Sequence, residues 1–174
     1  MSIYASTGAG CPTCGQPAAG NSKYCPTHKR AARQEWLDRV RDGAAVKAER
    51  DAAFRLLFAA AHAAGLAAGQ AAVPVPMVVQ QHRDMLDDQS PIRHEWIVPE
   101  GVCGFAWVVI KPGNCPAANY GKTNDGFKSH YHGGVAKWIS GFGQSYTRKR
   151  AYAAAFADVL HQAGINAWAD SRLD

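Results

Sequence analysis

Helix-favouring residues dominate the chain from about residue 29 to residue 68. This stretch is rich in Ala, Leu, Arg, Lys and Glu, which are strong helix formers. Gly43 interrupts it, so the pattern predicts two helices, at 29–42 and 44–68, or one bent helix. An apolar stripe at helical spacing comprises Trp36, Val40, Ala52, Leu56, Ala60 and Ala63. Because this face is rich in alanine, we expect another helix or a sheet to approach it closely.

The pattern changes to that of strands after residue 72. Pro74 and Pro76 force an extended path, which predicts an edge strand or a linker. We expect its apolar residues to dock on the core: Val75, Met77, Val78 and Val79. An exposed acidic loop is expected over 82–91, and strands are expected at 95–98, 104–110 and 134–139. The middle strand is apolar on both faces, which is typical of a central strand.

The C-terminal region carries the clearest helical pattern. Ser145 is a suitable N-cap, and Gly164 stands where a left-handed residue commonly ends a helix. The stripe between them comprises Tyr152, Phe156, Val159, Leu160 and Ala163. A short returning strand is expected at 165–168. The order of elements predicts an α+β fold in which one long C-terminal helix covers one face of a mostly antiparallel sheet.

Composition divides the 174 residues into three parts. We expect a small module at 1–30, a helical segment at 31–72 and an α+β domain at 73–174. The N-terminus lacks a basic-then-apolar signal pattern, and five cysteines without regular spacing are ordinary in a reducing cytosol. The longest uninterrupted apolar stretch, 102–110, is shorter than the roughly 20 residues of a membrane helix. These features predict a cytoplasmic protein without a membrane partner.

Four residues in the first module carry the clearest chemical signal. Cys11 and Cys14 are separated by two residues, and Cys25 and His28 repeat that spacing after a spacer with few apolar residues. Three thiolates and an imidazole can complete a tetrahedron around one zinc ion. The alternative is a metal-free tail with reduced or disulfide-linked cysteines. Because protein ligands would fill all four positions, we expect a structural zinc site rather than a catalytic one.

Positive charge gathers toward the amino end. The net charge is +5, and residues 1–80 hold 9 Lys and Arg against 5 Asp and Glu. Lys29, Arg30 and Arg33 follow the zinc module directly, which suits a polyanion such as nucleic acid. The alternative is a solvated face whose charges only maintain solubility.

A second basic cluster opens the C-terminal helix. Arg148, Lys149 and Arg150 lie in its first turn, where the helix dipole favours acidic residues. The preceding loop, 141–145, could hold a phosphate or carboxylate through its backbone N–H groups. The alternative is again a solvated cluster. We expect these cations, like those after the zinc module, to bind an anionic partner.

His130 and His132 lie two residues apart and could join Cys115 or His94 in a second metal site or a catalytic cluster. Surface histidines beside two glycines are the simpler interpretation. A metal-dependent nuclease would also need paired carboxylates or a general-base histidine in a recognisable frame, and none is readable.

Aromatic residues in the expected strands could form a base-stacking platform: Phe105, Trp107, Tyr131 and Trp138. Aromatic residues in strands more often belong to the core. The sequence contains no Ser/His/Asp frame, phosphate-binding Walker loop or dinucleotide fingerprint. We therefore expect a protein that is not an enzyme and takes no small-molecule substrate.

Two segments resemble known families. The run CPTCGQPAAGNSKYCPTHKR resembles the small zinc module at the front of many phage HNH endonucleases, but the catalytic His-Asn-His part is missing downstream. Residues 65–174, with EGVCGFAWVVIKPG, YAAAFADVLHQAGI and the terminal SRLD, resemble a family of small, mostly uncharacterised proteins of tailed phages and prophages. The resemblance implies a phage setting and offers no catalytic residues.

These observations predict a non-enzymatic, phage-type zinc-finger protein that binds nucleic acid or a nucleoprotein. Its most concrete form is an inhibitor of a host defence system, such as an anti-CRISPR protein. The alternative is a metal-dependent phosphodiesterase or nuclease that uses His130 and His132.

Overall fold

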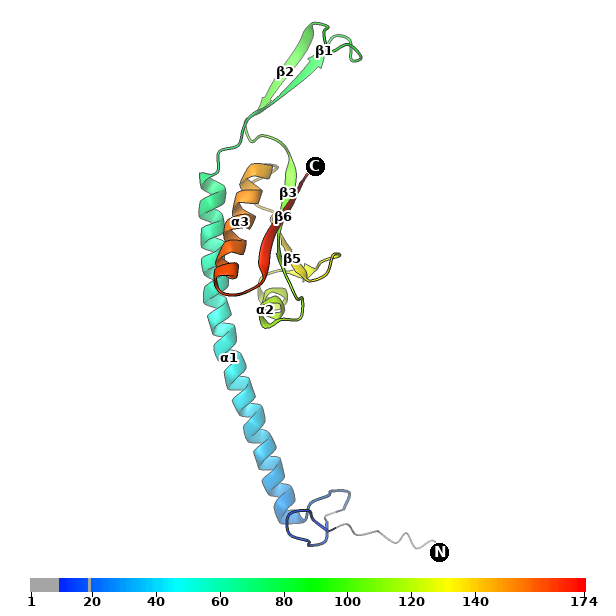
Figure 1. Cartoon of the computed structure of the whole chain (residues 1–174), viewed down its shortest axis with the longest axis vertical. Helices are drawn as coiled ribbons and strands as arrows, with labels where there is room; N and C mark the ends of the chain where they lie inside the picture. The colour runs from blue at the N-terminus through cyan, green and yellow to red at the C-terminus, as the bar shows by residue number, and fades with distance from the viewer. Residues whose placement is uncertain (1–9, 19) are drawn as a thin grey trace, which may run out of the picture. The chain divides into compact units, whose positions relative to one another are not determined.

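The computed structural model describes residues 10–18 and 20–174, and it divides into two compact units. The first unit ends at Arg50 and the second begins at Asp51. Helix α1 (Pro26–Ala71) starts in the first unit and ends in the second (Figure 1). The remaining helices and all of the strands follow within the second unit.

Helix α1 is continuous over 46 residues, so the expected division into helices 29–42 and 44–68 is wrong. A glycine within a helix costs only about 1 kcal/mol relative to alanine, and the strong helix formers around Gly43 offset that cost. Pro26 is the first residue of the helix, where its missing N–H costs no hydrogen bond. The helix ends at Ala71, before Pro74 restricts the backbone of the residue that precedes it.

The apolar stripe expected on α1 is not its buried face. Leu56 is 71% exposed, and Ala52, Ala60 and Ala63 are exposed as well. The buried face instead comprises Phe58, Ala61, Gly65 and Gly69. Alanines lie on every side of this helix, so the spacing of apolar residues does not distinguish its faces. The ring of Phe58 determines which face of the helix is buried, because an aromatic ring buries more apolar area than a methyl group does.

Two glycines on this face allow aromatic rings to lie against the helix backbone. A Cβ atom at Gly65 would lie 3.0 Å from the Tyr152 ring, and one at Gly69 would overlap the Phe142 ring. These rings therefore pack directly against the backbone of α1.

Helix α1 is long and apolar enough to cross a membrane, by length and composition alone. The core helices of water-soluble proteins also meet this criterion. The prediction from the sequence considered only an uninterrupted apolar run, whereas this criterion allows up to two charged residues in its window.

The main sheet has four antiparallel strands in the order β4-β5-β3-β6. These strands are β3 (Gly104–Ile110), β4 (Lys128–Ser129), β5 (Val135–Trp138) and β6 (Ala167–Leu173). The expected central position of 104–110 is confirmed, because β5 and β6 flank it. The strand expected at 165–168 extends to Leu173 because β6 pairs along the whole length of β3.

Helix α3 (Tyr146–Gln162) packs against β3 and β6, as expected for the C-terminal helix. Gly164 has a φ of +79°, and the N–H groups of Gly164 and Ile165 donate to His161 and Leu160. These bonds form a Schellman motif, which confirms the predicted helix end. Ser145 precedes the helix, but its hydroxyl donates to the Glu100 carbonyl at 2.8 Å rather than capping it.

Helix α2 (Pro116–Asn124) lies between β3 and β4, in a segment for which the sequence pattern predicted no helix or strand. Cys115 accepts a hydrogen bond from the Ala118 N–H through its sulfur at 3.4 Å, so it occupies the N-cap position. Pro116 follows at the first helical position. Pro116 is the one sequence feature that could have predicted the start of this helix, because cysteine is not a common N-cap residue.

A separate antiparallel hairpin precedes the main sheet. It consists of β1 (Met77–His82) and β2 (Ile92–Val98). Val75, Val78 and Val79 are 81%, 53% and 40% exposed, so the expectation that they dock on the core is wrong. Strand β1 pairs with β2 and not with the main sheet, and this pairing leaves their side chains on the hairpin surface.

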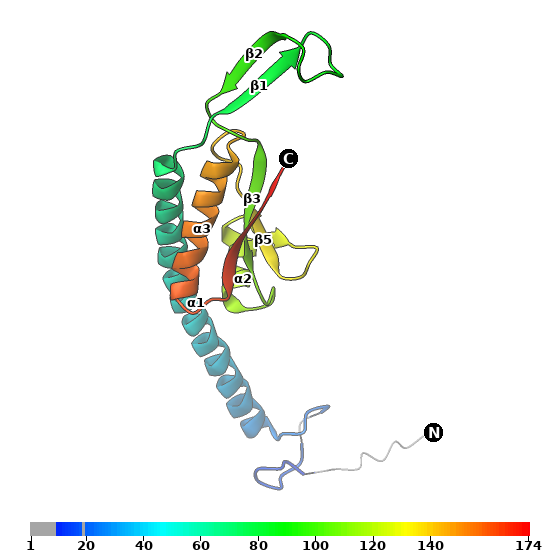
Figure 2. The ribbon, with the colours of Figure 1, turned by 45° about the horizontal axis from the view of Figure 1, so that its top comes forward.

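The core of the second unit lies between one face of the main sheet and the helices. Phe58, Phe156 and Leu160 contact the inward side chains of β3 there. Figures 1 and 2 both show α3 and the second part of α1 on the same side of the sheet. The structure therefore has the α+β architecture that the sequence predicted.

Candidate functional site

The four predicted metal ligands meet in the first unit. The ligand atoms of Cys11, Cys14, Cys25 and His28 all lie within 4.8 Å of one another. Cys14 Sγ is 3.7 Å from Cys25 Sγ, and His28 Nδ1 is 3.2 Å from Cys25 Sγ and 3.5 Å from Cys11 Sγ. These four side chains could hold one metal ion. They form the only such group of three or more His, Cys, Asp or Glu side chains within residues 10–18 and 20–174.

Local backbone structure sets the spacing within each half of this site. The N–H of Gly15 donates to the Cys11 carbonyl at 2.8 Å, and Gly15 has a φ of +72° that favours glycine. A Cβ atom at Gly10 would lie 2.5 Å from the Gly15 carbonyl oxygen, so only glycine fits there. Cys25 directly precedes the first residue of α1, and His28 lies in its first turn. The helix start thus fixes the spacing of the second ligand pair.

Hydrogen bonds around the Cys11 thiol favour its ionised form, the thiolate. Burial opposes this, but hydrogen bonds from the backbone N–H groups of Cys25, Thr13 and Cys14 lower the pKa of Cys11 to about 6. A thiolate is the form of cysteine that binds a metal ion. The backbone around the site therefore favours the ligand form of this residue.

The first basic cluster lies on α1 directly beyond His28. Lys29, Arg30 and Arg33 are all exposed. At about 100° per helical residue, they occupy an arc of roughly 100°. Their side chains make no ion pair or hydrogen bond with another side chain within the described ranges. The structure brings these three cations together next to the metal ligands.

The second basic cluster is not one surface. Lys149 is only 4% exposed, and its Nζ donates to the Gly104 carbonyl at 3.1 Å. Arg148 pairs with Glu100 at 3.0 Å and also donates to the carbonyl oxygens of Gly69 and Gln70. Arg150 is exposed. The expectation that the three side chains together face a partner is wrong, because tertiary packing gives two of them partners inside the second unit.

Some backbone N–H groups in and next to the loop at 141–145 already have hydrogen-bond partners. The N–H of Ser145 donates to the Phe142 carbonyl and the N–H of Tyr146 donates to the Val102 carbonyl, both at 3.1 Å. The two N–H groups nearest the helix start are therefore already used. This finding leaves fewer N–H groups for an anion at that position.

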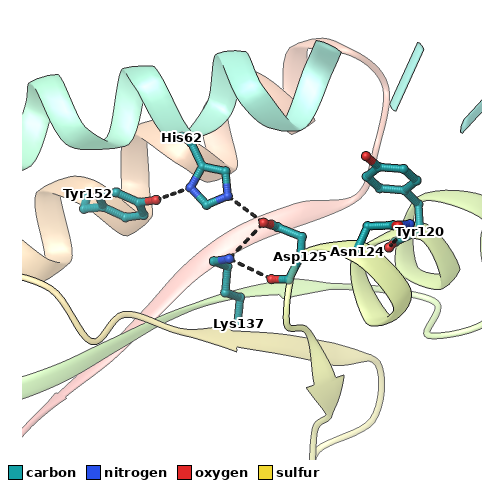
Figure 3. A network of polar contacts seen from close by, with 6 residues as sticks. All are labelled: His62, Tyr120, Asn124, Asp125, Lys137 and Tyr152. Carbon is teal, nitrogen blue, oxygen red and sulfur yellow. Dashed lines mark hydrogen bonds and ion pairs between the residues drawn. The ribbon is translucent and has the colours of Figure 1, made fainter. Parts of the chain in front are cut away.

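A polar network that the sequence did not indicate joins four elements of the second unit (Figure 3). His62 of α1 lies between Tyr152 of α3 and Asp125, which follows α2: its Nδ1 is 2.5 Å from the tyrosine oxygen and its Nε2 is 2.6 Å from Asp125 Oδ1. Lys137 of β5 donates to both Oδ1 and the backbone carbonyl of Asp125, at 3.0 and 2.7 Å. In the neutral tautomer that donates from Nε2–H to the carboxylate, Nδ1 accepts a hydrogen bond from the Tyr152 O–H.

This chain of hydrogen bonds borders a cavity of about 370 Å³ lined by His62, Lys137, Phe142 and Tyr152, among others. Burial, and secondarily the Asp125 carboxylate, raises the pKa of Tyr152 to about 12. The phenol therefore stays protonated at neutral pH and is a poor nucleophile. Apart from Asp125 Oδ2, which is buried without a partner among the described residues, these groups are hydrogen-bonded and join α1, α3 and β5 to the end of α2, which is a structural role. Its members are up to 90 residues apart, so no local sequence signal could have identified it.

Replacing Tyr152 with phenylalanine is expected to change how stability depends on alkaline pH. A pKa raised from its ordinary value of 10 to about 12 means that the folded state favours the neutral phenol. The stability associated with this group is complete below pH 10 and is lost as pH rises through about 12. Urea unfolding from pH 8 to 12 should show a smaller decline for Tyr152→Phe than for the wild type.

The same variant should lose about 1 kcal/mol at pH 7, because the hydrogen bond to His62 is removed. Tyr131→Phe is a suitable control, since Tyr131 is 79% exposed. Parallel pH curves for the wild type and Tyr152→Phe would contradict the assignment.

His130 and His132 lie in the turn between β4 and β5, with ring centroids 5.7 Å apart. No further His, Cys, Asp or Glu side chain of residues 10–18 or 20–174 joins them in a group that could hold a metal. Neither Cys115 nor His94 therefore completes a second metal site in the structure.

No family model, no curated protein and no solved structure matches this chain. The resemblance to phage proteins therefore stays a prediction. The functional argument depends on the residues themselves.

Proposed function

We propose that this chain is a non-enzymatic binding protein whose zinc-stabilised first module contacts nucleic acid or a nucleoprotein. One observation carries the proposal: three exposed cations, which pair with no other side chain in the described part of the chain, directly follow a complete set of metal ligands. A metal that fixes the helix start also fixes the position of these cations. A rigid cationic face loses less conformational entropy when it binds than a flexible basic tail does.

Zinc suits this set of ligands better than other common metal ions. Thiolates and imidazole exclude magnesium and calcium, which prefer oxygen ligands. In a tetrahedral site with a Zn–S distance of about 2.3 Å, two sulfurs lie about 3.8 Å apart. The sulfurs of Cys14 and Cys25 are 3.7 Å apart. Protein side chains fill all four positions, so the ion would stabilise the module and perform no chemistry.

The triple variant Lys29→Ala, Arg30→Ala, Arg33→Ala is expected to weaken binding to nucleic acid. Each lost phosphate contact reduces the slope of log K against log salt by about 0.9 on duplex DNA, so loss of all three should reduce it by up to about 3. Stability should hardly change, because exposed charges without close partners contribute little. Fluorescence anisotropy with a labelled DNA duplex across a salt series measures both affinity and slope.

The matched control removes the same charge elsewhere, through Arg83→Ala, Arg93→Ala and Lys122→Ala. All three residues are exposed in the second unit. Equal slopes for the two triple variants would show that total charge, and not the face beside the metal site, determines affinity. That result would contradict the proposed location.

Inhibition of a host defence complex, as by an anti-CRISPR protein, is the specific form of this proposal that the phage resemblance supports. Such a protein would act in the host cytoplasm on a nucleoprotein. Arg150 remains an exposed cation in the second unit that could contribute to such a contact. Metal-dependent cleavage of the labelled DNA that is lost in His130→Ala or His132→Ala would overturn the non-enzymatic proposal.

A further inference from the structure

The two faces of the main sheet have different environments. Alternate residues of β3 point to opposite faces, and Ala106, Val108 and Ile110 belong to the core beneath the helices. Phe105, Trp107 and Val109 therefore point to the other face. Strand pairing places Trp138 of β5 opposite Trp107, and Trp168 of β6 opposite Val109. In Figures 1 and 2, α3 and the second part of α1 lie on the opposite side of the sheet.

Aromatic rings cover this outer face, which we call the aromatic face: Phe105, Trp107, Trp138 and Trp168. The rings of Trp107 and Trp138 are stacked, with centroids 5.6 Å apart and an interplanar angle of 7°. Phe105 lies next to them, with its centroid 5.0 Å from that of Trp138. Trp138 is 51% exposed, so much of this large apolar side chain remains accessible to a ligand.

Buried ring nitrogens beside this face lack partners. Trp107 is 7% exposed, and its Nε1–H has no hydrogen-bond acceptor within the described part of the chain. Both ring nitrogens of His130 are likewise buried without a partner there. These two side chains line a cavity of about 510 Å³ together with Trp138, Lys128 and Arg172. A cavity lined by two indole rings and an imidazole suits a flat ligand.

The charges around the aromatic face are mainly positive. Lys128 and Arg172 line the cavity and are exposed, and Lys111 Nζ lies 5.5 Å from the Trp168 ring centroid. One acid, Asp170, points to the same face opposite Trp107, and its carboxylate accepts a hydrogen bond from the Ser171 N–H. Three cations against one acid favour an anionic ligand.

We infer that the aromatic face binds single-stranded nucleic acid by stacking a base on Trp138. The base lies over the cavity beside the rings of Trp107 and His130, whose buried nitrogens do not contact it. Lys128 and Arg172 contact the flanking phosphates. Aromatic platforms on a sheet with cations around them are a common arrangement for single strands, since every base has a flat face to stack. This inference builds on the proposed function, because it assigns the bases to a surface of the second unit.

The chain offers a closely matched pair of variants to test this inference. Trp138 and Trp96 are both 51% exposed, and Trp96 lies on the hairpin strand β2. Trp138→Ala is expected to weaken binding of the full-length protein to labelled oligo(dT) and oligo(U) about 10-fold or more, the range seen for loss of one stacked base. Trp96→Ala should bind as the wild type does. Anisotropy measures affinity, and circular dichroism melts confirm that both variants fold.

Competition by inorganic polyphosphate tests whether binding depends on base stacking or on charge alone. It carries phosphates but no bases, so it should compete weakly with oligo(dT) for the wild type. Competition as strong as that of unlabelled oligo(dT), or equal affinities for Trp138→Ala and Trp96→Ala, would overturn the inference.

The outcomes also separate this inference from the proposed function. Loss of binding in the Lys29, Arg30 and Arg33 triple variant together with full binding by Trp138→Ala would reject the aromatic face and retain the function proposed for the first module. A wild-type protein that binds neither single strands nor duplex at low salt would reject both.

Discussion

Cys14→Ser is expected to remove one zinc ion per chain and to unfold the metal-binding module, while the second unit keeps its cooperative thermal transition. Residues 10–18 and 20–25 contain no helix or strand, so little besides the metal can order them. Metal binding in such a module contributes folding free energy directly, about 10–16 kcal/mol in small zinc domains at pH 7. Elemental analysis measures the metal content, and calorimetry measures the transition of the second unit.

Cys103→Ser provides the matched control for this experiment. Cys103 is a free cysteine of the second unit and is not part of the ligand group, so its loss should leave the zinc content unchanged. Full zinc content in Cys14→Ser, or equal loss of zinc in the two variants, would rule out the four-ligand site. Loss of the thermal transition of the second unit in Cys14→Ser would show that the two units do not fold independently.

Asp125→Ala is expected to destabilise the second unit by about 2–3 kcal/mol. The substitution removes the carboxylate that accepts from both His62 and Lys137, and Lys137 keeps only its bond to the backbone carbonyl of residue 125. Loss of one partner from a buried network costs more than the network contributes to stability, because the remaining groups keep their desolvation penalty. For a unit of this size, the thermal midpoint should fall by about 10 °C.

Two further variants determine the cause of that loss. Asp158→Ala removes an exposed carboxylate from α3 and should change stability by no more than about 0.5 kcal/mol. Adding Lys137→Met to Asp125→Ala should recover part of the loss, since an ammonium group that has lost its counter-charge is then removed. A midpoint for Asp125→Ala equal to that of Asp158→Ala would show that the network does not stabilise the fold.

Several elements could be predicted because their signals are local. The metal ligands depend on two short spacings, and the end of α3 depends on one glycine that accepts a positive φ. The central position of β3 follows from its continuous apolar run. In each of these cases, a few residues that are close in sequence determine the structural feature.

Other elements could not be predicted because their causes are distant in sequence. Helix α1 buries the face with Phe58 because the rings of Tyr120, Phe127 and Phe156 lie against it. Lys149 is buried because the Gly104 carbonyl, 45 residues away, accepts its hydrogen bonds. The sequence placed this lysine with its neighbours as a surface cation, since a helix terminus alone gives no indication of what packs over it.

The sequence by itself determined the metal ligands, the α+β order of elements and the cations beside the metal site, because spacing and composition specify these directly. Only the tertiary structure decided which face of α1 is buried, which cations remain exposed, and that Asp125 joins His62, Lys137 and Tyr152. It also placed Trp107 and Trp138 on the sheet face away from the core. Burial and pairing depend on residues that chain folding brings together, and hydrophobic periodicity does not specify these long-range contacts.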